Sequence, residues 1–122
     1  MKQKAMPRMP QAEFLTGLIE QFPGLEADLL DEDYSFSIHL QVGCWATYAN
    51  HCVAAGQLEE VRKALNYFQQ TVGRVDPATE NALYVSFLEH LEFEGGTLNA
   101  KKARSMLSPV YQHIWQELRK GR

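Results

Sequence analysis

Positive charge is missing from one long segment of this sequence, residues 9–61. Between Met9 and Val61 there is no Lys or Arg, while nine acidic residues give that span a formal charge of about −9. The whole chain of 122 residues carries −3, so the residues on either side of the span are net basic. Because contacts to nucleic-acid phosphates need clustered cations, this distribution argues against direct binding of nucleic acid.

Long apolar runs are missing as well. The most apolar stretch is interrupted by Gln41, Thr47 and Asn50, and it falls short of the roughly eighteen apolar residues of a membrane span. The first ten residues include basic side chains but no apolar segment of a secretory signal. We therefore expect a cytoplasmic protein with no membrane partner.

Cysteine is scarce, and its placement excludes an internal disulfide. Cys44 and Cys52 are eight residues apart on one expected helix. Their Cα atoms should therefore be about 12 Å apart, whereas a disulfide needs less than about 7 Å. We expect two free thiols on a buried face. A nucleophilic cysteine needs an exposed thiol of low pKa, so this position argues against cysteine catalysis.

Motifs for catalysis and for metal or cofactor binding are also absent. The four histidines include no pair at helical spacing of three or four, which a metal site on one helix face would need. The chain has no glycine-rich phosphate loop, nucleophile elbow or dinucleotide fingerprint. We expect no catalytic residue, no metal and no cofactor.

What the sequence does contain is helical periodicity, most clearly over residues 36–55. Apolar residues recur there at intervals of three and four, and a second apolar stripe widens the predicted buried arc to most of the circumference. Only Gln41, Thr47, Asn50 and His39 are left for solvent. This stretch is expected to be the central helix of the core.

Proline and glycine divide the rest of the chain into further helices. We expect a helix over 10–21, a short helix within 26–33, a helix from Leu58 to Gly73 that pairs with the central helix, a helix from Pro77 to Gly95 and a helical stretch over 98–119. Pro109 either kinks or splits the last stretch. No alternating β pattern of useful length occurs. The expected fold is an all-α bundle of five to six helices, with one domain over 10–122 and a flexible basic arm over 1–9.

Two segments resemble known families. The first, which resembles a tetratricopeptide-type helix pair, comprises Trp45, Tyr48, Ala49, Gly56, Val61, Leu65 and Phe68. The second resembles a segment of small bacterial helical proteins, some of which resemble toxin immunity proteins, and comprises Asn81, Leu83, Val85, Phe87, Leu88, Glu89 and Leu91. The second resemblance implies a protein that neutralises a toxin, and it transfers no functional residue.

The densest charge in the chain provides the candidate binding site. Five acidic residues occur within eight positions, followed at once by an aromatic residue: Glu26, Asp28, Asp31, Glu32, Asp33 and Tyr34. A surface of one sign steers association with an oppositely charged partner, so these residues are expected to dock a protein with a basic surface, such as a nuclease-like toxin domain. The alternative is a solvated acidic loop that only maintains solubility.

Two other functions stay open. A helical hairpin can act as an adaptor that binds a peptide helix in a groove. A small-ligand binder or enzyme would instead use a pocket near Trp45, with Tyr48, Tyr111 and Trp115 among its candidate lining residues. Core packing is the commoner role of such aromatic residues.

Overall fold

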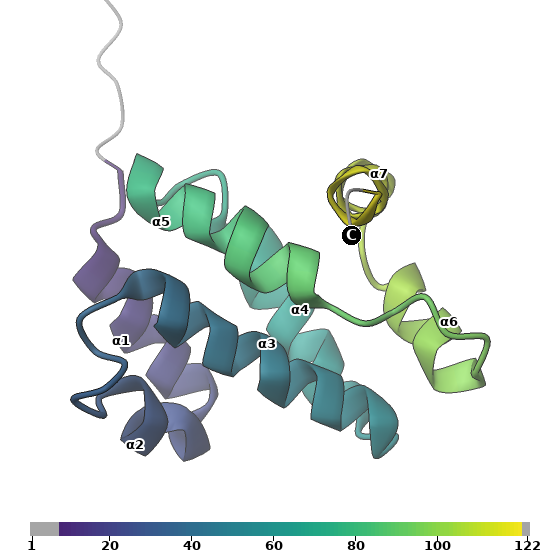
Figure 1. Cartoon of the computed structure of the whole chain (residues 1–122), viewed down its shortest axis with the longest axis horizontal. Coiled ribbons are helices and arrows are strands. Elements are labelled where there is room, and N and C mark those ends of the chain that lie inside the picture. The colour runs from purple at the N-terminus through teal and green to yellow at the C-terminus, as the bar shows by residue number, and fades with distance from the viewer. Residues whose placement is uncertain (1–7, 121–122) are drawn as a thin grey trace, which may run out of the picture.

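Helix α3 (Ile38–Ala54) runs through the middle of the bundle in the computed structural model, which describes residues 8–120 (Figure 1). The Ser37 side chain caps its first turn by accepting a hydrogen bond from the Leu40 N–H. Gly56 ends the helix in the left-handed region, with φ +74°. Because α3 contacts α2, α4, α5 and α6, the prediction of a central helix is confirmed. The observed helix is slightly shorter than the expected 36–55.

The N-terminal helices cover one end of α3. Helix α1 (Gln11–Gln21) is followed by the single turn η1 (Pro23–Leu25) and the short helix α2 (Glu26–Leu29), as expected from the Pro23–Gly24 break. Phe14 and Leu18 of α1 are fully buried. The Tyr67 hydroxyl of α4 donates a hydrogen bond of 2.7 Å to the Phe14 carbonyl, which ties α1 to the bundle.

Helix α4 (Leu58–Thr71) returns along α3 directly after the Gly56 turn, so the predicted helical hairpin is confirmed. Its buried residues recur at helical spacing and face the core; they are Val61, Ala64, Leu65, Phe68 and Thr71. In its first turn Glu59 is exposed and pairs with Arg62, whereas Glu60 is half-buried, pairs with Lys63 and also accepts from the Tyr48 hydroxyl of α3.

The next helix changes its winding along its length. Helix α5 (Pro77–Ala82) begins at Asp76, whose side chain accepts from the Thr79 N–H at 2.9 Å, and it passes into a π-helical segment η2 (Leu83–Phe87) and a 3₁₀ turn η3 (Leu88–His90). Together these segments run alongside α3 (Figure 1). The expected end at Gly95 and Gly96 is wrong. The helix stops at His90, because Leu91 adopts an extended conformation and side chains from other helices bind the backbone that follows.

Pro109 splits the last helical stretch in two. Helix α6 (Leu98–Ser105) is capped by Thr97, and α7 (Pro109–Arg119) begins with the proline at its first position. The Gln69 side chain of α4 bridges the break, accepting from the Ser108 N–H at 2.8 Å and donating to the Met106 carbonyl at 3.2 Å. With this split the described residues form seven α-helices, more than the five to six expected, and the all-α class is confirmed.

The core is built around the Trp45 side chain, which is fully buried. Its indole contacts the rings of Phe14, Phe22, Tyr67 and Phe87, with centroids at most 6.2 Å apart. Tryptophan on the central helix therefore joins α1, α4 and η2 in one aromatic cluster.

Two positions on α3 differ from the expected pattern. Gln41 was expected to face solvent, yet it is only 2% exposed, because its side chain donates a hydrogen bond of 2.8 Å to the Leu29 carbonyl of α2. Leu40 was assigned to a buried stripe but is 40% exposed. The helix is thus open to solvent on the side of Leu40 and covered on the side of Gln41 by α2.

The expected basic arm is bound to the domain at its inner end. Met9 pairs in parallel with Val75, donating from its N–H to the Arg74 carbonyl at 2.7 Å and accepting from the Asp76 N–H at 3.0 Å. The Arg8 guanidinium donates to the Gly73 and Val75 carbonyls. The prediction of a flexible arm over 1–9 is therefore wrong for Arg8 and Met9. The rest of the predicted arm, residues 1–7, lies outside the described residues. Within residues 8–120 no helix has the length and apolarity needed to cross a bilayer.

Candidate functional site

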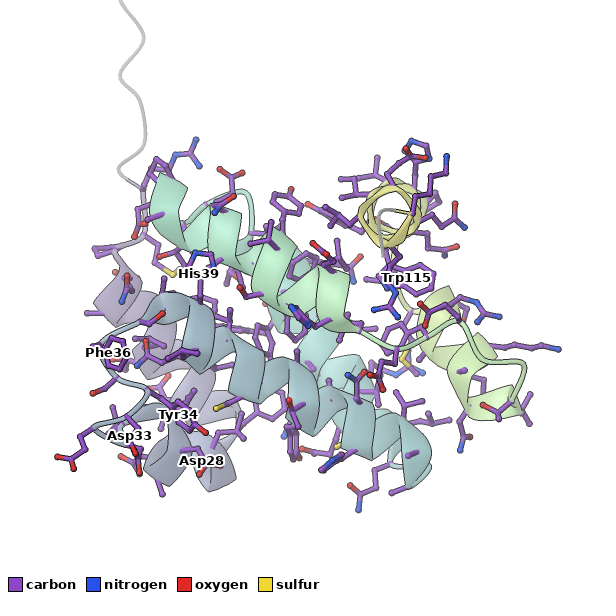
Figure 2. The ribbon with its side chains drawn as sticks, in the orientation of Figure 1. Asp28, Asp33, Tyr34, Phe36, His39 and Trp115 are labelled. Carbon is purple, nitrogen blue, oxygen red and sulfur yellow. The ribbon has the colours of Figure 1, made fainter. Side chains whose placement is uncertain are left out.

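The predicted acidic residues lie in and after α2, next to the N-terminus of α3, and all of them are exposed: Glu26, Asp28, Asp31, Glu32 and Asp33. The loop that carries the last three has an ordered backbone. The Asp31 carboxylate accepts from the Asp33 N–H at 2.7 Å, and the Asp31 carbonyl accepts from the N–H groups of Tyr34 and Ser35. Figure 2 shows Asp28, Asp33, Tyr34 and Phe36 at the same end of the bundle.

These carboxylates have no cationic partner within residues 8–120. The four ion pairs there involve Glu59, Glu60, Glu94 and Glu117, and the cation of each pair follows Val61 in the sequence. Glu59 and Glu60 are paired because they lie at the very end of the cation-free span, one turn before Arg62 and Lys63. The absence of cations between Met9 and Val61 explains the difference, because no neighbour in sequence can neutralise the run. The negative charge of this segment is therefore available to a partner.

Exposed apolar side chains accompany the acidic ones. Six large apolar residues are exposed in the described part of the chain, and four of them fall within residues 30–40: Leu30 at 56%, Tyr34 at 38%, Phe36 at 77% and Leu40 at 40%. Only Tyr34 was singled out from the sequence. The other three were missed. Periodicity assigned Leu40 to a buried stripe, Leu30 was used only as a sign of the short helix within 26–33, and Phe36 was placed inside the central helix, whereas α3 begins at Ile38. We call the five acids with these four residues the α2–α3 face.

A groove adjoins this face along the exposed side of α3. Its volume is about 480 Å³. Residues of α3, of the loop before it and of the η2–η3 region line the groove: Tyr34, His39, Leu40, Gly43, Cys44, Thr47, Asn50, Ser86, His90 and Glu92. Tyr34 and Leu40 belong to both the groove and the α2–α3 face, so the two features are continuous. We refer to this feature as the α3 groove.

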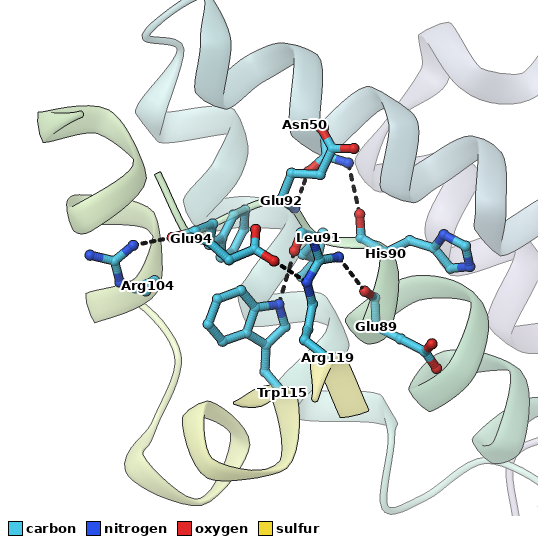
Figure 3. A network of polar contacts seen from close by, with 10 residues as sticks. Asn50, Glu89, His90, Leu91, Glu92, Glu94, Arg104, Trp115 and Arg119 are labelled. Atoms are coloured by element: carbon cyan, nitrogen blue, oxygen red, sulfur yellow. Dashed lines mark hydrogen bonds and ion pairs between the residues drawn. The ribbon is translucent and has the colours of Figure 1, made fainter. Parts of the chain in front are cut away.

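Hydrogen bonds across the α3 groove hold its two walls together. Near one end, His39 Nδ1 and Ser86 Oγ are 2.6 Å apart. At the other end, the Asn50 side chain donates to the His90 carbonyl at 2.9 Å and accepts from the Glu92 N–H at 2.8 Å (Figure 3). Asn50 thereby pairs with an extended backbone as a neighbouring strand would, and it fixes the wall formed by residues 90–92.

The same extended segment is held from its other side by the C-terminal helices (Figure 3). Trp115 Nε1 donates to the Leu91 carbonyl at 2.9 Å. Arg119 donates to the Glu89 carbonyl at 2.6 Å and pairs with the Glu94 carboxylate, while Arg104 donates to the Phe93 carbonyl. Because the segment is held on both sides, the groove has a wall of defined position although that wall is not helical.

Cys44 lies in the α3 groove and is only partly buried, so the expectation that both thiols are buried is wrong for this residue. Burial raises the pKa of the Cys44 thiol, and the charges of Asp28 and Asp31 raise it further. Burial is also the largest cause of the raised pKa of Cys52, which is buried as expected. Both cysteines are free, as predicted. A raised pKa favours the thiol over the thiolate, which is the opposite of an activated nucleophile.

Among the described residues, no group of three or more His, Cys, Asp and Glu side chains is placed to hold a metal ion. The aromatic residues named for a ligand pocket do not line the groove. Trp45 and Trp115 are buried in the core, and Tyr48 and Tyr111 pack against it. The groove instead uses the opposite side of α3 from Trp45. Sequence periodicity contained a signal for it, namely the polar positions Thr47 and Asn50.

Residues 15–121 match the model of a family described as Domain of unknown function (DUF7674), and the chain belongs to that family. No curated protein and no solved structure matches the chain.

Proposed function

We propose that this family member is a cytoplasmic, non-enzymatic binding protein that docks a protein with a basic surface through its α2–α3 face. The observation that carries the proposal is the coincidence of unpaired carboxylates and exposed apolar side chains in one short segment, residues 26–40. Solvation explains exposed acids alone, but it does not explain why most of the exposed apolar side chains lie among them.

The two kinds of side chain have different effects on association. The carboxylates raise the rate of encounter with a basic partner, and salt screens this effect. The apolar side chains slow dissociation, since burying a residue such as Phe36 against a partner contributes about 1.5–3 kcal/mol. A surface of this composition resembles the core and rim of a protein interface, in which aromatic residues are enriched at the centre.

The biological role that best suits such a face is neutralisation of a basic toxin. A nuclease-like toxin must attract phosphate, so its functional surface is basic and an acidic protein can cover it. This role agrees with the resemblance of residues 81–91 to proteins that resemble toxin immunity proteins. It requires no catalytic group, metal or cofactor in this chain.

The adaptor alternative receives less support from the geometry of the α3 groove. An amphipathic peptide helix needs an apolar groove for its anchors. Most side chains that line this groove are polar or charged, including Asn50, Ser86 and Glu92, and several already make hydrogen bonds. A groove of this kind suits a partner with exposed polar backbone better than it suits an apolar helix face.

The test begins with recovery of the partner from the source cell by cross-linking and affinity capture, followed by association kinetics with the purified pair. Glu32 and Asp33 should be reversed together to Lys, because neither side chain makes an ion pair among residues 8–120. The matched control is the double reversal of Glu13 and Glu20, two exposed acids of α1 with the same change of net charge.

We expect the Glu32→Lys/Asp33→Lys variant to associate about tenfold or more slowly at low salt, and to lose most of the salt dependence of association. Melting should change little, since exposed substitutions usually alter stability by less than about 0.5 kcal/mol. Phe36→Ala should raise the dissociation rate and leave the association rate nearly unchanged. If the α1 control slows association as much as the test variant does, only net charge matters and the α2–α3 face is not the docking site.

A further inference from the structure

Gly43 occupies a position where glycine is unfavourable for folding. It lies in the interior of α3, and glycine within a helix costs roughly 0.5–1 kcal/mol relative to alanine. A Cβ atom built at Gly43 would meet no other atom within 4 Å, so nothing in the packing of the bundle requires its absence. The residue faces the α3 groove, where a side chain would occupy open space.

Gly17, in the interior of α1, is a glycine that the packing of the fold does require. Gly17 of α1 is in close contact with the Tyr67 hydroxyl, and a Cβ atom there would collide with it. That glycine permits the hydrogen bond from Tyr67 to the Phe14 carbonyl. Gly43 has no such internal partner, so packing within the fold does not account for its lack of a side chain. Glycine is used where another backbone must approach closely.

The charge of the α3 groove limits what kind of ligand can bind there. Among the residues that the structure describes, no Lys or Arg lines it. Its one carboxylate, that of Glu92, is exposed and makes no ion pair within residues 8–120. Burial is the largest cause of the raised pKa of Cys44, and the charges of Asp28 and Asp31 raise it further, in line with a negative potential in the groove. The groove is complementary to a cation.

Resting on the docking function proposed above, we propose that the α3 groove binds an extended segment of the same basic partner. The main chain of that segment crosses α3 at Gly43, and one of its Lys or Arg side chains reaches the carboxylate of Glu92. The groove joins the α2–α3 face at Tyr34 and Leu40, so one continuous stretch of partner covers both.

The dimensions and polarity of the groove suit an extended chain. Gly43 and Asn50 are about 10 Å apart along the helix axis, a length that about three residues of extended polypeptide span. Such a chain has unpaired N–H and C=O groups on both edges. The His90 imidazole lies along the groove to pair with them, and the Thr47 hydroxyl, which donates to the Gly43 carbonyl at 3.1 Å, can still accept from an N–H. A helix has its backbone groups already paired and would offer these side chains no backbone partner.

The experiment uses the full chain and a fluorescein-labelled octapeptide in which Lys and Ser alternate, with fluorescence anisotropy as the readout. Gly43→Leu places a side chain in the groove, and Thr47→Tyr obstructs it from a second position if the first variant melts early. Ala54→Leu is the matched control, because it places the same leucine side chain at an exposed position of α3 outside the groove. A peptide with Glu in place of Lys controls for charge.

We expect wild type and Ala54→Leu to bind the Lys peptide equally, Gly43→Leu and Thr47→Tyr to bind it at least tenfold more weakly, and Glu92→Gln to bind it severalfold more weakly. No binding of the Glu peptide is expected. Equal affinity for Gly43→Leu and wild type, or no saturable binding by wild type, would overturn the proposal. Displacement of the peptide by lysine amide at equal concentration would also overturn it, since a small cation would then suffice.

The same variants separate this inference from the docking function. If Gly43→Leu binds the intact partner as wild type does, whereas Glu32→Lys/Asp33→Lys does not, the α2–α3 face is the whole docking site and the groove inference fails alone. If the double reversal leaves partner binding unchanged, the docking function fails whatever the peptide does.

Discussion

Trp45 of α3 and Phe87 of η2 stack with their ring centroids 3.9 Å apart and their planes inclined by 20°. The contact joins the middle of the central helix to the π-helical segment, where the extra residue in the turn displaces the side chains that follow. Ser86 precedes Phe87 and faces the α3 groove, where it meets His39. Adjacent residues of η2 thus serve two roles: Phe87 packs on Trp45 in the core, and Ser86 forms part of the groove wall.

Trp45→Ala should lower the free energy of unfolding by about 3–5 kcal/mol, the usual cost of deleting a large buried aromatic side chain. The indole is fully buried and contacts four other rings, so the cavity cannot close without moving several helices. Urea denaturation measures the change. Phe36→Ala is the control, because its 77% exposed ring should contribute less than about 0.5 kcal/mol. A loss below about 1 kcal/mol at Trp45 would contradict its place at the centre of the core.

Alanine should have opposite effects at the two helical glycines. Gly43→Ala should raise the free energy of unfolding by about 0.5–1 kcal/mol, because it removes backbone entropy from the unfolded chain and the new methyl group meets no atom. Gly17→Ala should lower it, because the methyl group would displace the Tyr67 hydroxyl from the Phe14 carbonyl. Thermal and urea denaturation of both variants provide the comparison. Destabilisation by Gly43→Ala would mean that the fold itself requires that glycine.

The two thiols should react at different rates. Cys44 lies partly exposed in the α3 groove and Cys52 is buried, and burial raises the pKa of both. Because the thiolate is the reactive form, labelling of native protein with a disulfide reagent at neutral pH should be slow, should accelerate as pH rises and should modify Cys44 first. Both should react after denaturation. Cys44→Ser identifies the faster site, and rapid labelling of Cys52 in native protein would contradict its burial.

Stability should fall in acid partly through Glu60. The hydrogen bond that the Tyr48 hydroxyl donates to Glu60 at 2.6 Å is the largest cause that lowers the pKa of this carboxyl; burial opposes it, and Lys63 lowers the pKa further. A carboxyl whose pKa is lower in the folded state stabilises the protein above its unfolded pKa, about 4.3 for Glu, and this contribution disappears as pH falls through the folded value.

Glu60→Gln should therefore cost roughly 1 kcal/mol at neutral pH and much less well below pH 4. Urea denaturation of both proteins across this range measures the difference. Glu59→Gln is the control, since Glu59 is highly exposed beside Arg62 and its pair should contribute little. A cost for Glu60→Gln that does not change with pH would show that the carboxylate form is not the one stabilised.

Sequence-based prediction was accurate where local residues decide the structure and failed where contacts from distant residues decide it. The central helix, the Gly56 turn and the Asp76–Pro77 start were predictable because local residues decide them through periodicity, left-handed conformation and capping. The helix end before Leu91 was not. The glycines that follow are a strong local signal, but Asn50 and Trp115 pair with the backbone of residues 90–92 and end the helix earlier.

By itself the sequence determined the all-α class, the core role of Trp45 and the negative charge of residues 26–33, because each depends on residue type and spacing along one segment. Only the tertiary structure decided which side of α3 is open. Leu40 and Gln41 are neighbours of opposite polarity, and their positions are the reverse of what periodicity predicts, since α2 covers Gln41 and supplies the Leu29 carbonyl for its amide. The α3 groove has the same origin. It exists because residues 34–50 and residues 86–92, which are far apart in the sequence, meet along α3. No local sequence pattern encodes such a contact.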